Sequence, residues 1–536
     1  MSTEHPPTAQ SQHFTEEPDM PKPTADYFAR LGALVAIDDA ASRPTRPVLE
    51  AFSGTEMATI PVATAEDLET AVDRARQAQQ GWAARTPAER AQVIDKFSAL
   101  VYRNAEALMD IAQAETGKAR IYAQEEVLDV AITARHYATN GPKLLADRKV
   151  KGMLPGATSV RVRHLPKGVI GVISPWNYPL TLAVSDAVAA LVAGNGVVIK
   201  PDSQTPYCAL ALAELLYQAG LPRELYAVVP GPGGVVGQAI MASTDYVMFT
   251  GSSATGATLA EQAGRRLIGF SAELGGKNPM VVTANADIAN AVQGAARAAF
   301  SNSGQLCISI ERIYVDKQIA DEFAERFAAF VSMMKLSGTY DFTADMGSLA
   351  SAAQIDTAEA HVQDAVAKGA KVLAGGKRRP DLGPFFFEPT VLTDVTDDMV
   401  CYGNETFGPV VSIYPVDSTD EAVKLANDTE YGLNASVFAG SSAEAQAVAE
   451  RLRAGTVNIN EGYAAAWAST AAPMGGMGIS GVGRRHGEEG LLKYTEAQTI
   501  AEQRFIGIDR APLVPKNIYR AITPTAVRAL KYLPGR

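Results

Sequence analysis

The sequence predicts an α/β protein that contains two doubly wound domains, each built on a parallel sheet. Between residues 168 and 264, short apolar strands alternate with helices, and this order is typical of a parallel sheet with helices on both faces. A second alternating set begins near residue 279. The chain has 536 residues, of which 47% are apolar, so it is long enough to form several large cores.

The segments before the first sheet are predicted to be mainly helical. Within residues 63–145, apolar residues recur at helical spacing after Thr64. Near residue 158 the pattern changes to alternation, which predicts a strand or hairpin that leads into a buried strand. Residues 180–199 are strongly apolar, but Asp186 and a Gly-Asn-Gly break favour a buried helix, a turn and a strand over a membrane span.

Composition and charge exclude several classes of protein. The 48 basic and 59 acidic side chains give a formal charge of −11, which argues against nucleic-acid binding. Cys208, Cys307 and Cys401 are far apart and form neither a disulfide framework nor a zinc motif, so we expect no metal site and a reducing, cytoplasmic location. The first 25 residues lack the apolar segment of a secretory signal, and we expect a mobile tail there.

Cys307 and Glu273 are the first candidates for chemistry. Cys307 follows a helical segment and a Ser-Gly turn and precedes a strand, and a thiol at such a break can gain backbone N–H donors that favour the thiolate. A buried structural cysteine is the more common role of a lone cysteine. Glu273 precedes two glycines, so a general base and a salt-bridged glutamate both remain open for it.

Asn177 and Lys200 lie where ligands bind in doubly wound sheets, beyond the carboxyl ends of strands. Asn177 stands between prolines, and its rigid carboxamide can donate to a developing oxyanion, whereas Lys200 offers an ammonium to a ribose or phosphate. Both residue types are also common in turns and at surfaces. The chain lacks the G-x-G-x-x-G, P-loop, zincin and G-x-S-x-G motifs, so those classes lose support.

Seven segments that occur in one order are more specific together than any of them alone. They are SPWNYP, VVIKPDSQTP, FTGSSATG, ELGGKNP, FSNSGQLC, NETFGP and PMGGMGISGVGR. From about residue 50 to 500 the chain resembles the aldehyde dehydrogenase superfamily, and it is most similar to the actinobacterial NADP-dependent succinate-semialdehyde dehydrogenases. The resemblance implies two Rossmann-type domains without the usual glycine fingerprint, plus a small β arm for oligomerisation.

The resemblance also implies a mechanism. Cys307 is the expected nucleophile, and its attack on an aldehyde gives a thiohemiacetal. Asn177 and the Cys307 backbone N–H form the oxyanion hole, hydride leaves for the nicotinamide, and water activated by Glu273 hydrolyses the remaining thioester. A CoA-acylating enzyme and a crystallin-like relative without turnover are the alternatives. The retained Glu273 argues against the first, and all three intact residues argue against the second.

The implied cofactor is NADP, with NAD as the alternative. NAD-preferring relatives commonly carry Glu where this chain has Ser203, and a carboxylate there would repel the 2′-phosphate of NADP. We expect Asp202, which follows a proline, to point to solvent. The expected cofactor contacts are Ser174, Pro175, Trp176, Lys200, Ser203, Gly233, Thr250, Gly251, Ser252, Leu274, Glu405 and Phe407.

The substrate is expected to be succinic semialdehyde, which is oxidised to succinate. Many enzymes of this specificity carry an Arg eight positions after the oxyanion Asn, where this chain has Ser185. A broader specificity for aliphatic or aromatic aldehydes therefore remains the alternative. The expected pocket residues are Tyr178, Ser185, Ile308, Tyr463 and Trp467.

The resemblance divides the chain into five parts. They are a mobile tail (1–25), a cofactor-binding domain (26–148 and 168–275), an oligomerisation arm (149–167 and 489–505), a catalytic domain (276–488) and a C-terminal tail (506–536). We expect a homodimer or homotetramer. The C-terminal tail is basic and partly apolar, and docking over the substrate mouth or a neighbouring subunit is preferred over weak attachment to an anionic membrane.

Overall fold

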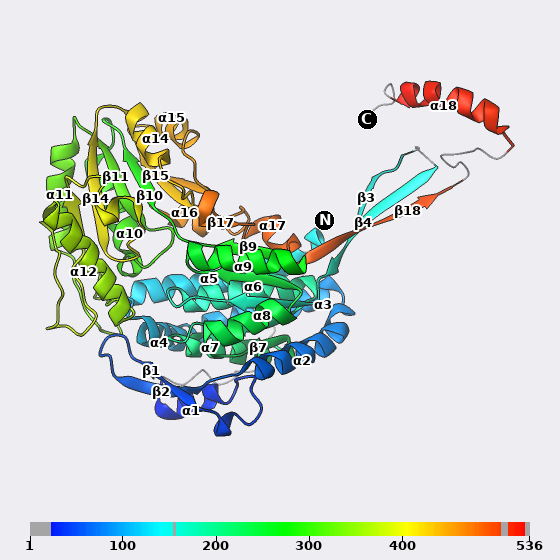
Figure 1. Ribbon diagram of the computed structural model, residues 1–536, viewed down its shortest axis with the longest axis horizontal. Coiled ribbons are helices and arrows are strands. Elements are labelled where there is room, and N and C mark those ends of the chain that lie inside the picture. Colours follow the sequence, from blue (N-terminus) through cyan, green and yellow to red (C-terminus); the bar gives the residue numbers. More distant parts are fainter. Residues whose placement is uncertain (1–22, 154–156, 505–512, 531–536) are drawn as a thin grey trace, which may run out of the picture.

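A computed structural model describes residues 23–153, 157–504 and 513–530 of the chain. Most of the two expected terminal tails, including residues 1–22, 505–512 and 531–536, lies outside this described part. Figure 1 shows two sheet-containing bodies and a β arm that projects away from them.

The first body is built on a six-stranded sheet with the order β17-β9-β8-β5-β6-β7. Its strands are β5 (Val169–Ile173), β6 (Gly196–Lys200), β7 (Tyr226–Val228), β8 (Tyr246–Thr250), β9 (Gly269–Glu273) and β17 (Gly481–Val482). Strands β5 to β9 are parallel, and β17 pairs antiparallel with β9 at the edge. The strand order reverses between β5 and β8, and ligands bind beyond the carboxyl ends of strands at such a switch point.

Helices and one small hairpin pack around this sheet. They are α1 (Ala25–Gly32), β1 (Thr45–Leu49), β2 (Glu56–Pro61), α2 (Ala65–Ala83), α3 (Pro87–Arg103), α4 (Ala105–Thr116), α5 (Arg120–Leu144), α6 (Pro179–Ala193), α7 (Pro206–Gln218), α8 (Gln238–Ser243), α9 (Ser253–Arg266) and α17 (Gly487–Leu492). The expected helix after Thr64 is α2, and Thr64 and Asp67 form a capping box at its start. Residues 180–199 fold as the expected buried helix, turn and strand.

The second body is a seven-stranded sheet with the order β12-β13-β14-β11-β10-β15-β16. Its strands are β10 (Asn278–Val282), β11 (Ile310–Asp316), β12 (Lys371–Ala374), β13 (Thr390–Thr393), β14 (Val410–Val416), β15 (Asn434–Phe438) and β16 (Thr456–Ile459). Its helices are α10 (Ile288–Phe300), α11 (Ala320–Ser332), α12 (Ala352–Ala367), α13 (Val400–Gly403), α14 (Thr419–Asn427), α15 (Ser442–Ala449) and α16 (Ala464–Trp467). The predicted fold class is confirmed, although β12 pairs antiparallel at this sheet's edge.

The arm is a three-stranded antiparallel sheet made of β3 (Arg148–Lys151), β4 (Thr158–Pro166) and β18 (Thr495–Gln503). Helix α18 (Lys516–Leu530) lies beyond the end of the arm and away from both bodies, so it does not cover the ends of the sheets in its own chain (Figure 1). Within the described residues, no helix is both long and apolar enough to cross a membrane.

One expected helix differs from the structure. Alternation predicted a helix over residues 234–243, but Gly233–Gly237 form a wide π turn and α8 begins only at Gln238. The glycines explain the difference, because they offer no side chains to stabilise a regular helical turn. The short 3₁₀ turns are Ala40–Ser42, Arg223–Leu225, Ser301–Gly304 and Gly478–Ser480.

Candidate active site

Cys307 lies in a rigid break between the 3₁₀ turn Ser301–Gly304 and β11. Asn302, Ser303 and Gly304 have consecutive φ values of 50°, 57° and 72°, which only a tightly held backbone sustains. The Gln305 side chain supplies part of this restraint, because it donates to the Asn302 carbonyl at 3.1 Å and accepts from the Ala350 N–H at 2.9 Å. The turn therefore presents Cys307, which is partly exposed, at a fixed position.

Asn278 holds the Cys307 backbone from the neighbouring strand. Its amide nitrogen donates to the carbonyls of Cys307 at 2.8 Å and Ser309 at 2.7 Å, and its oxygen accepts from the Asn434 N–H at 2.9 Å. Gly276 allows this close approach, because a Cβ there would lie 2.5 Å from the Cys307 carbonyl oxygen. Sequence analysis missed Asn278, although it lies in the ELGGKNP segment, because nothing local distinguishes it from a turn residue.

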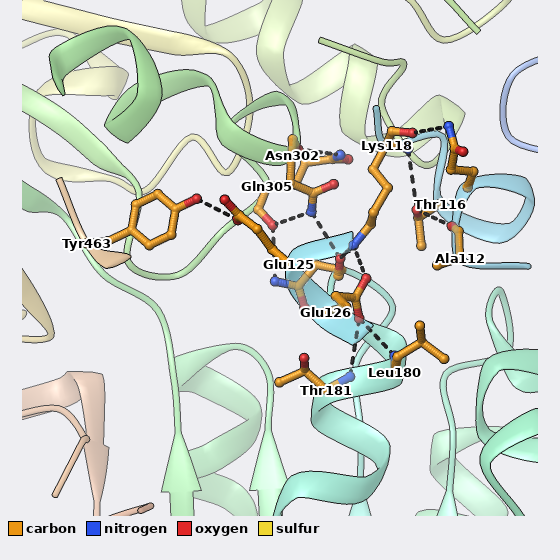
Figure 2. Close-up of polar contacts among 12 residues, drawn as sticks. Ala112, Thr116, Lys118, Glu125, Glu126, Leu180, Thr181, Asn302, Gln305 and Tyr463 are labelled. Carbon is orange, nitrogen blue, oxygen red and sulfur yellow. Dashed lines mark hydrogen bonds and ion pairs between the residues drawn. The ribbon is translucent and has the colours of Figure 1, made fainter. Parts of the chain in front are cut away.

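Asn177 is buried and is tied to the same loop as Cys307. Its side-chain nitrogen donates to the Gln305 carbonyl at 3.1 Å, and its backbone carbonyl accepts from the Asn302 amide at 3.0 Å. A carboxamide nitrogen has two N–H donors, so one remains for a ligand. Figure 2 shows Asn302 and Gln305 close to Lys118 and Glu126, which sequence analysis did not identify.

An apolar cluster surrounds Cys307. The buried side chains are Tyr178, Leu182, Leu306, Ile308, Leu433, Tyr463 and Met474, and Cys307, Ala464 and Trp467 pack against them. The Tyr178 hydroxyl is buried and has no hydrogen-bond partner among the described residues. Four of the five expected pocket residues therefore meet here. Ser185 lies three residues after the cluster member Leu182 on α6, where it is buried and donates to Asp129 at 3.1 Å.

Glu273 ends β9 and is buried within the electrostatic range of Cys307. Burial raises the pKa of Glu273 to about 7, although Arg485 opposes the rise. A carboxylate with this pKa suits a general base at neutral pH. Burial and the carboxylates of Glu273 and Glu405 raise the pKa of Cys307 to about 12. The backbone N–H of Cys307 lowers this pKa, as expected of a local donor, but burial and the two carboxylates outweigh it.

Arg485 connects Glu273 to a buried network that the sequence did not reveal. It donates to Asp186 at 2.6 Å and to the Thr250 hydroxyl at 3.3 Å. Lys493 and the Tyr494 hydroxyl also donate to Asp186, at 2.9 and 2.8 Å. Burial by itself would raise the pKa of Asp186, but the two cations lower it overall, so Asp186 stays charged and paired.

The expected cofactor residues gather at the carboxyl ends of β5, β6 and β8. The Ser174 N–H donates to the Lys200 carbonyl at 3.1 Å, and Pro175 follows it. Ser252 caps α9, the Gly251 N–H donates to the Glu273 carbonyl at 3.1 Å, and the Leu274 N–H donates to the Ser480 carbonyl at 2.9 Å. Gly233 follows β7, the parallel neighbour of β6, in the exposed π turn described above.

Lys200 is buried at the end of β6, and its ammonium donates to the Pro201 carbonyl at 3.0 Å. Burial lowers its pKa, Asp202 opposes this, and Arg46 of β1 lowers the pKa further, which places a second cation nearby. Asp202 is only partly exposed and accepts from the Gln204 N–H at 2.9 Å, so it does not simply face solvent. Ser203 is also partly exposed in this turn.

Glu405 and Phe407 belong to the second body, in the loop between α13 and β14. Glu405 accepts from the Gly276 N–H at 2.8 Å, and burial raises its pKa to about 8. The Phe407 ring meets Trp176 edge to face, with centroids 5.5 Å apart. A buried lysine with the exposed Arg46 near it, the Glu405 carboxyl group and the N-terminus of α9 are chemical groups that fit a dinucleotide, because a helix N-terminus can bind phosphate.

Known proteins identify this arrangement. The model of the aldehyde dehydrogenase family matches residues 38–500. This chain belongs to that family. A Mycolicibacterium smegmatis relative, provisionally named succinate-semialdehyde dehydrogenase (NADP+), is 62% identical over 517 residues, which are 96% of this chain and all of the relative. The succinate semialdehyde dehydrogenase of Acinetobacter baylyi is 34% identical, covering 80% of this chain and 88% of that protein.

Solved structures of aldehyde dehydrogenases have the same fold. Betaine aldehyde dehydrogenase from Staphylococcus aureus, in complex with NAD+, aligns with a TM-score of 0.85 and 31% identity, over 90% of this chain and 99% of that one. An NADP-dependent enzyme of E. coli aligns with a TM-score of 0.82 and 33% identity, over 86% of this chain and 95% of that one. The fold expected of an aldehyde dehydrogenase is thereby confirmed.

Proposed function

We propose that this aldehyde dehydrogenase oxidises succinic semialdehyde to succinate with NADP, through a thiohemiacetal and then a thioester on Cys307. The observation that carries the proposal is the convergence of Cys307, Asn177 and Glu273 beside one apolar cluster. The names of the relatives from Mycolicibacterium and Acinetobacter support the substrate, and the first of them supports the cofactor.

Cys307 attacks the aldehyde carbon as a thiolate, after its thiol proton has left to solvent. The oxygen that becomes negatively charged is stabilised by the free N–H of the Asn177 amide and by the Cys307 backbone N–H. Because the Gln305 carbonyl and the Asn302 amide hold Asn177, this donor is oriented before substrate arrives.

NADP, when bound, supplies the acceptor for the hydride that leaves the aldehyde carbon. Lys200, Arg46 and Ser203 would hold the 2′-phosphate, Ser252 at the start of α9 the pyrophosphate, and Glu405 the nicotinamide ribose. The thioester left on Cys307 is attacked by water. Glu273 takes a proton from that water, and the carboxylic acid leaves as the Cys307 sulfur is released.

Substrate choice rests on the pocket wall. Ser185 bonds Asp129 and provides no cation for a distal carboxylate. The unpartnered Tyr178 hydroxyl provides a donor in the same cluster as Cys307. A tyrosine donor among apolar side chains also admits neutral aliphatic or aromatic aldehydes, so broader specificity is the second candidate function.

The proposal is tested by cofactor reduction with purified protein. Succinic semialdehyde, glutaric semialdehyde, hexanal and benzaldehyde are each offered with NADP and with NAD, and each pair is repeated with CoA. The proposal expects the highest kcat/KM for succinic semialdehyde with NADP and no dependence on CoA. A higher kcat/KM for hexanal or benzaldehyde would support the broader specificity instead.

The assembly proposed for this enzyme is a homodimer or homotetramer in the cytoplasm. The projecting arm supports it, because β18 forms a long outer edge of the arm sheet beyond both bodies (Figure 1). Exposed strand edges of this kind are usually paired with another chain. Analytical ultracentrifugation of the full chain tests this, and a monomer at micromolar concentration would contradict it.

A further inference from the structure

A fully buried ion pair lies beside the proposed oxyanion hole (Figure 2). Lys118 follows α4, Glu126 belongs to α5, and both side chains are 0% exposed. A buried ion pair is poor evidence for stability, because well-packed apolar residues of the same volume often stabilise a protein as much or more. The contacts of this pair point instead to the Asn177 backbone.

Lys118 joins the pair to Asn177 and Tyr178. Its ammonium bonds the Glu126 carboxylate and also donates to the Asn177 backbone carbonyl at 2.9 Å. The same ammonium lies 4.1 Å from the centre of the Tyr178 ring, which is a cation–π contact. One buried charge thus touches the oxyanion residue and a wall of the substrate pocket.

Glu126 holds the next residues of the same segment. One of its oxygens accepts from the backbone N–H groups of Leu180 at 2.8 Å and Thr181 at 3.2 Å. These groups lie in the first turn of α6, where the N-cap residue Tyr178 supplies no side-chain hydrogen bond. Glu126, which belongs to α5, therefore takes the place of a side-chain cap at the start of α6. The Tyr178 side chain is then free of the capping role and lines the pocket.

We propose that the Lys118–Glu126 pair positions the oxyanion hole, by fixing the backbone of residues 177–181 so that the Asn177 amide and the Tyr178 ring keep their places. The inference rests on the proposed role of Asn177. Lys118 and Glu126 touch no reacting atom in this account and act only through that segment. Loss of the pair should therefore impair the chemical step more than it impairs cofactor binding.

The test is a double-mutant cycle on kcat with Lys118→Met, Asn177→Ala and both together, using succinic semialdehyde and NADP. We expect Lys118→Met to lower kcat about 10- to 100-fold, less than the roughly 100- to 1000-fold cost of losing an oxyanion donor. The KM for NADP should change less than about 2-fold. The double variant should lose less activity than the product of the two single losses, because Lys118 acts in part through Asn177.

Several outcomes would overturn the proposal. They are an unchanged kcat in Lys118→Met, or a double variant whose loss is the product of the two single losses. Circular dichroism and NADP binding check that each variant folds, and if Lys118→Met does not fold, the same cycle is run with Glu126→Gln. Asn177→Ala with normal kcat would contradict the oxyanion role itself, which separates failure of the proposed function from failure of this inference.

Lys277→Met is the matched control, because Lys277 is a second buried lysine paired with a glutamate. Its partner Glu311 holds the loop of Glu405 and Phe407, and in the described part of the chain Lys277 has no hydrogen bond or ion pair with Asn177 or Tyr178. Its loss should raise the KM for NADP. In a double-mutant cycle with Asn177→Ala, the kcat loss of the double variant should equal the product of the two single losses. A non-multiplicative cycle for Lys277→Met as well would show that loss of any buried lysine disturbs Asn177, and would overturn the specific role of Lys118.

Discussion

Two buried lysine–glutamate pairs flank the candidate active site, one from each sheet-containing body. Glu126 accepts backbone N–H groups of Leu180 and Thr181, after the oxyanion residue. Glu311 accepts those of Thr406 and Phe407 at 3.0 Å, in the loop that carries Glu405. Each glutamate is paired with a lysine, Lys118 or Lys277, and one glutamate holds the first turn of α6 whereas the other holds a loop.

The difference between the pairs lies in what the lysine touches. Lys118 also contacts the Asn177 carbonyl and the Tyr178 ring, so its pair acts on the chemical and substrate side. The Lys277 carbonyl instead accepts from Arg312 at 2.6 Å, and its pair acts on the loop expected to hold the nicotinamide ribose. Two pairs of the same kind therefore act on different parts of the site. Variants of the Lys118–Glu126 pair should change mainly kcat, and variants of the Lys277–Glu311 pair should change mainly the KM for NADP.

The largest expected effect lies on the chemical side and removes the nucleophile. Cys307→Ala should abolish aldehyde oxidation, because no other thiol lies in the apolar cluster of described residues. NADP binding, measured by fluorescence or calorimetry, should survive because the cofactor contacts are elsewhere. Buried Cys208→Ala is the control, and it should retain activity. Normal turnover by Cys307→Ala would rule out the covalent mechanism.

A direct comparison of the two pairs tests whether they act on different kinetic parameters. Glu126→Gln should lower kcat several-fold, because Lys118 loses its counter-charge beside Asn177. Glu311→Gln should raise the KM for NADP several-fold at nearly constant kcat, because it loosens Thr406 and Phe407. Steady-state kinetics at saturating aldehyde measure both. If the two variants change the same parameter, the division of labour between the pairs is wrong.

Substitution of Ser203 tests the preference for NADP over NAD on the cofactor side. A carboxylate placed near the 2′-phosphate by Ser203→Glu would cost on the order of 1–4 kcal/mol at ~4 Å. We therefore expect the KM for NADP to rise by roughly one to three decades, with a shift in preference towards NAD. Ser203→Gln is the matched control, since it has similar size without charge. Wild-type protein that uses NAD better than NADP would contradict the prediction and implicate Asp202 as the ribose ligand.

The smallest expected effect concerns α18. Its Ile518 and Ile522 are about half exposed, and Arg520 and Arg528 make it basic, whereas the whole chain carries a formal charge of −11. We expect it to dock on a neighbouring subunit, so truncation after Ala511 should weaken the oligomer while kcat changes less than about 2-fold. Sedimentation measures this. An unchanged oligomer and substrate range would exclude docking, and sedimentation with anionic liposomes would then test membrane attachment.

The sequence predicts the fold well because alternation of strands and helices is a local property. The two doubly wound sheets, α2 with its capping box and the buried α6–β6 unit all follow from patterns within a few residues. The wide turn at Gly233–Gly237 does not, because glycines carry no pattern that distinguishes a π turn from a helix.

The site was predictable only where residues lie in recognisable segments. Cys307, Glu273 and Asn177 could be selected because each lies in such a segment. Lys118 could not, since it meets Asn177 across 59 residues of chain, and a lysine after a helix is ordinarily a surface residue. Asn278 lies in a recognised segment and Arg485 directly follows one, but their roles were missed because their partners Cys307 and Asp186 lie 29 and 299 residues away in the chain. The Ser185–Asp129 hydrogen bond was not predictable either, because position along α6 does not show which neighbour a hydroxyl reaches.

The central claim is a thioester on Cys307 that Glu273 helps to hydrolyse. Burial raises the pKa of Glu273 to about 7. In the wild-type protein, the rate of thioester hydrolysis should therefore increase as the pH rises through about 7, because the Glu273 carboxyl group loses its proton and becomes a base. Glu273→Gln removes this base and should trap the intermediate.

The most direct measurement is peptide mass spectrometry of Glu273→Gln after mixing with succinic semialdehyde and NADP. The account predicts a single burst of NADPH and a succinyl adduct on the peptide that contains Cys307, with no adduct in Glu273→Gln/Cys307→Ala. Continuous turnover without a burst, or an adduct confined to Cys208 or Cys401, would contradict it.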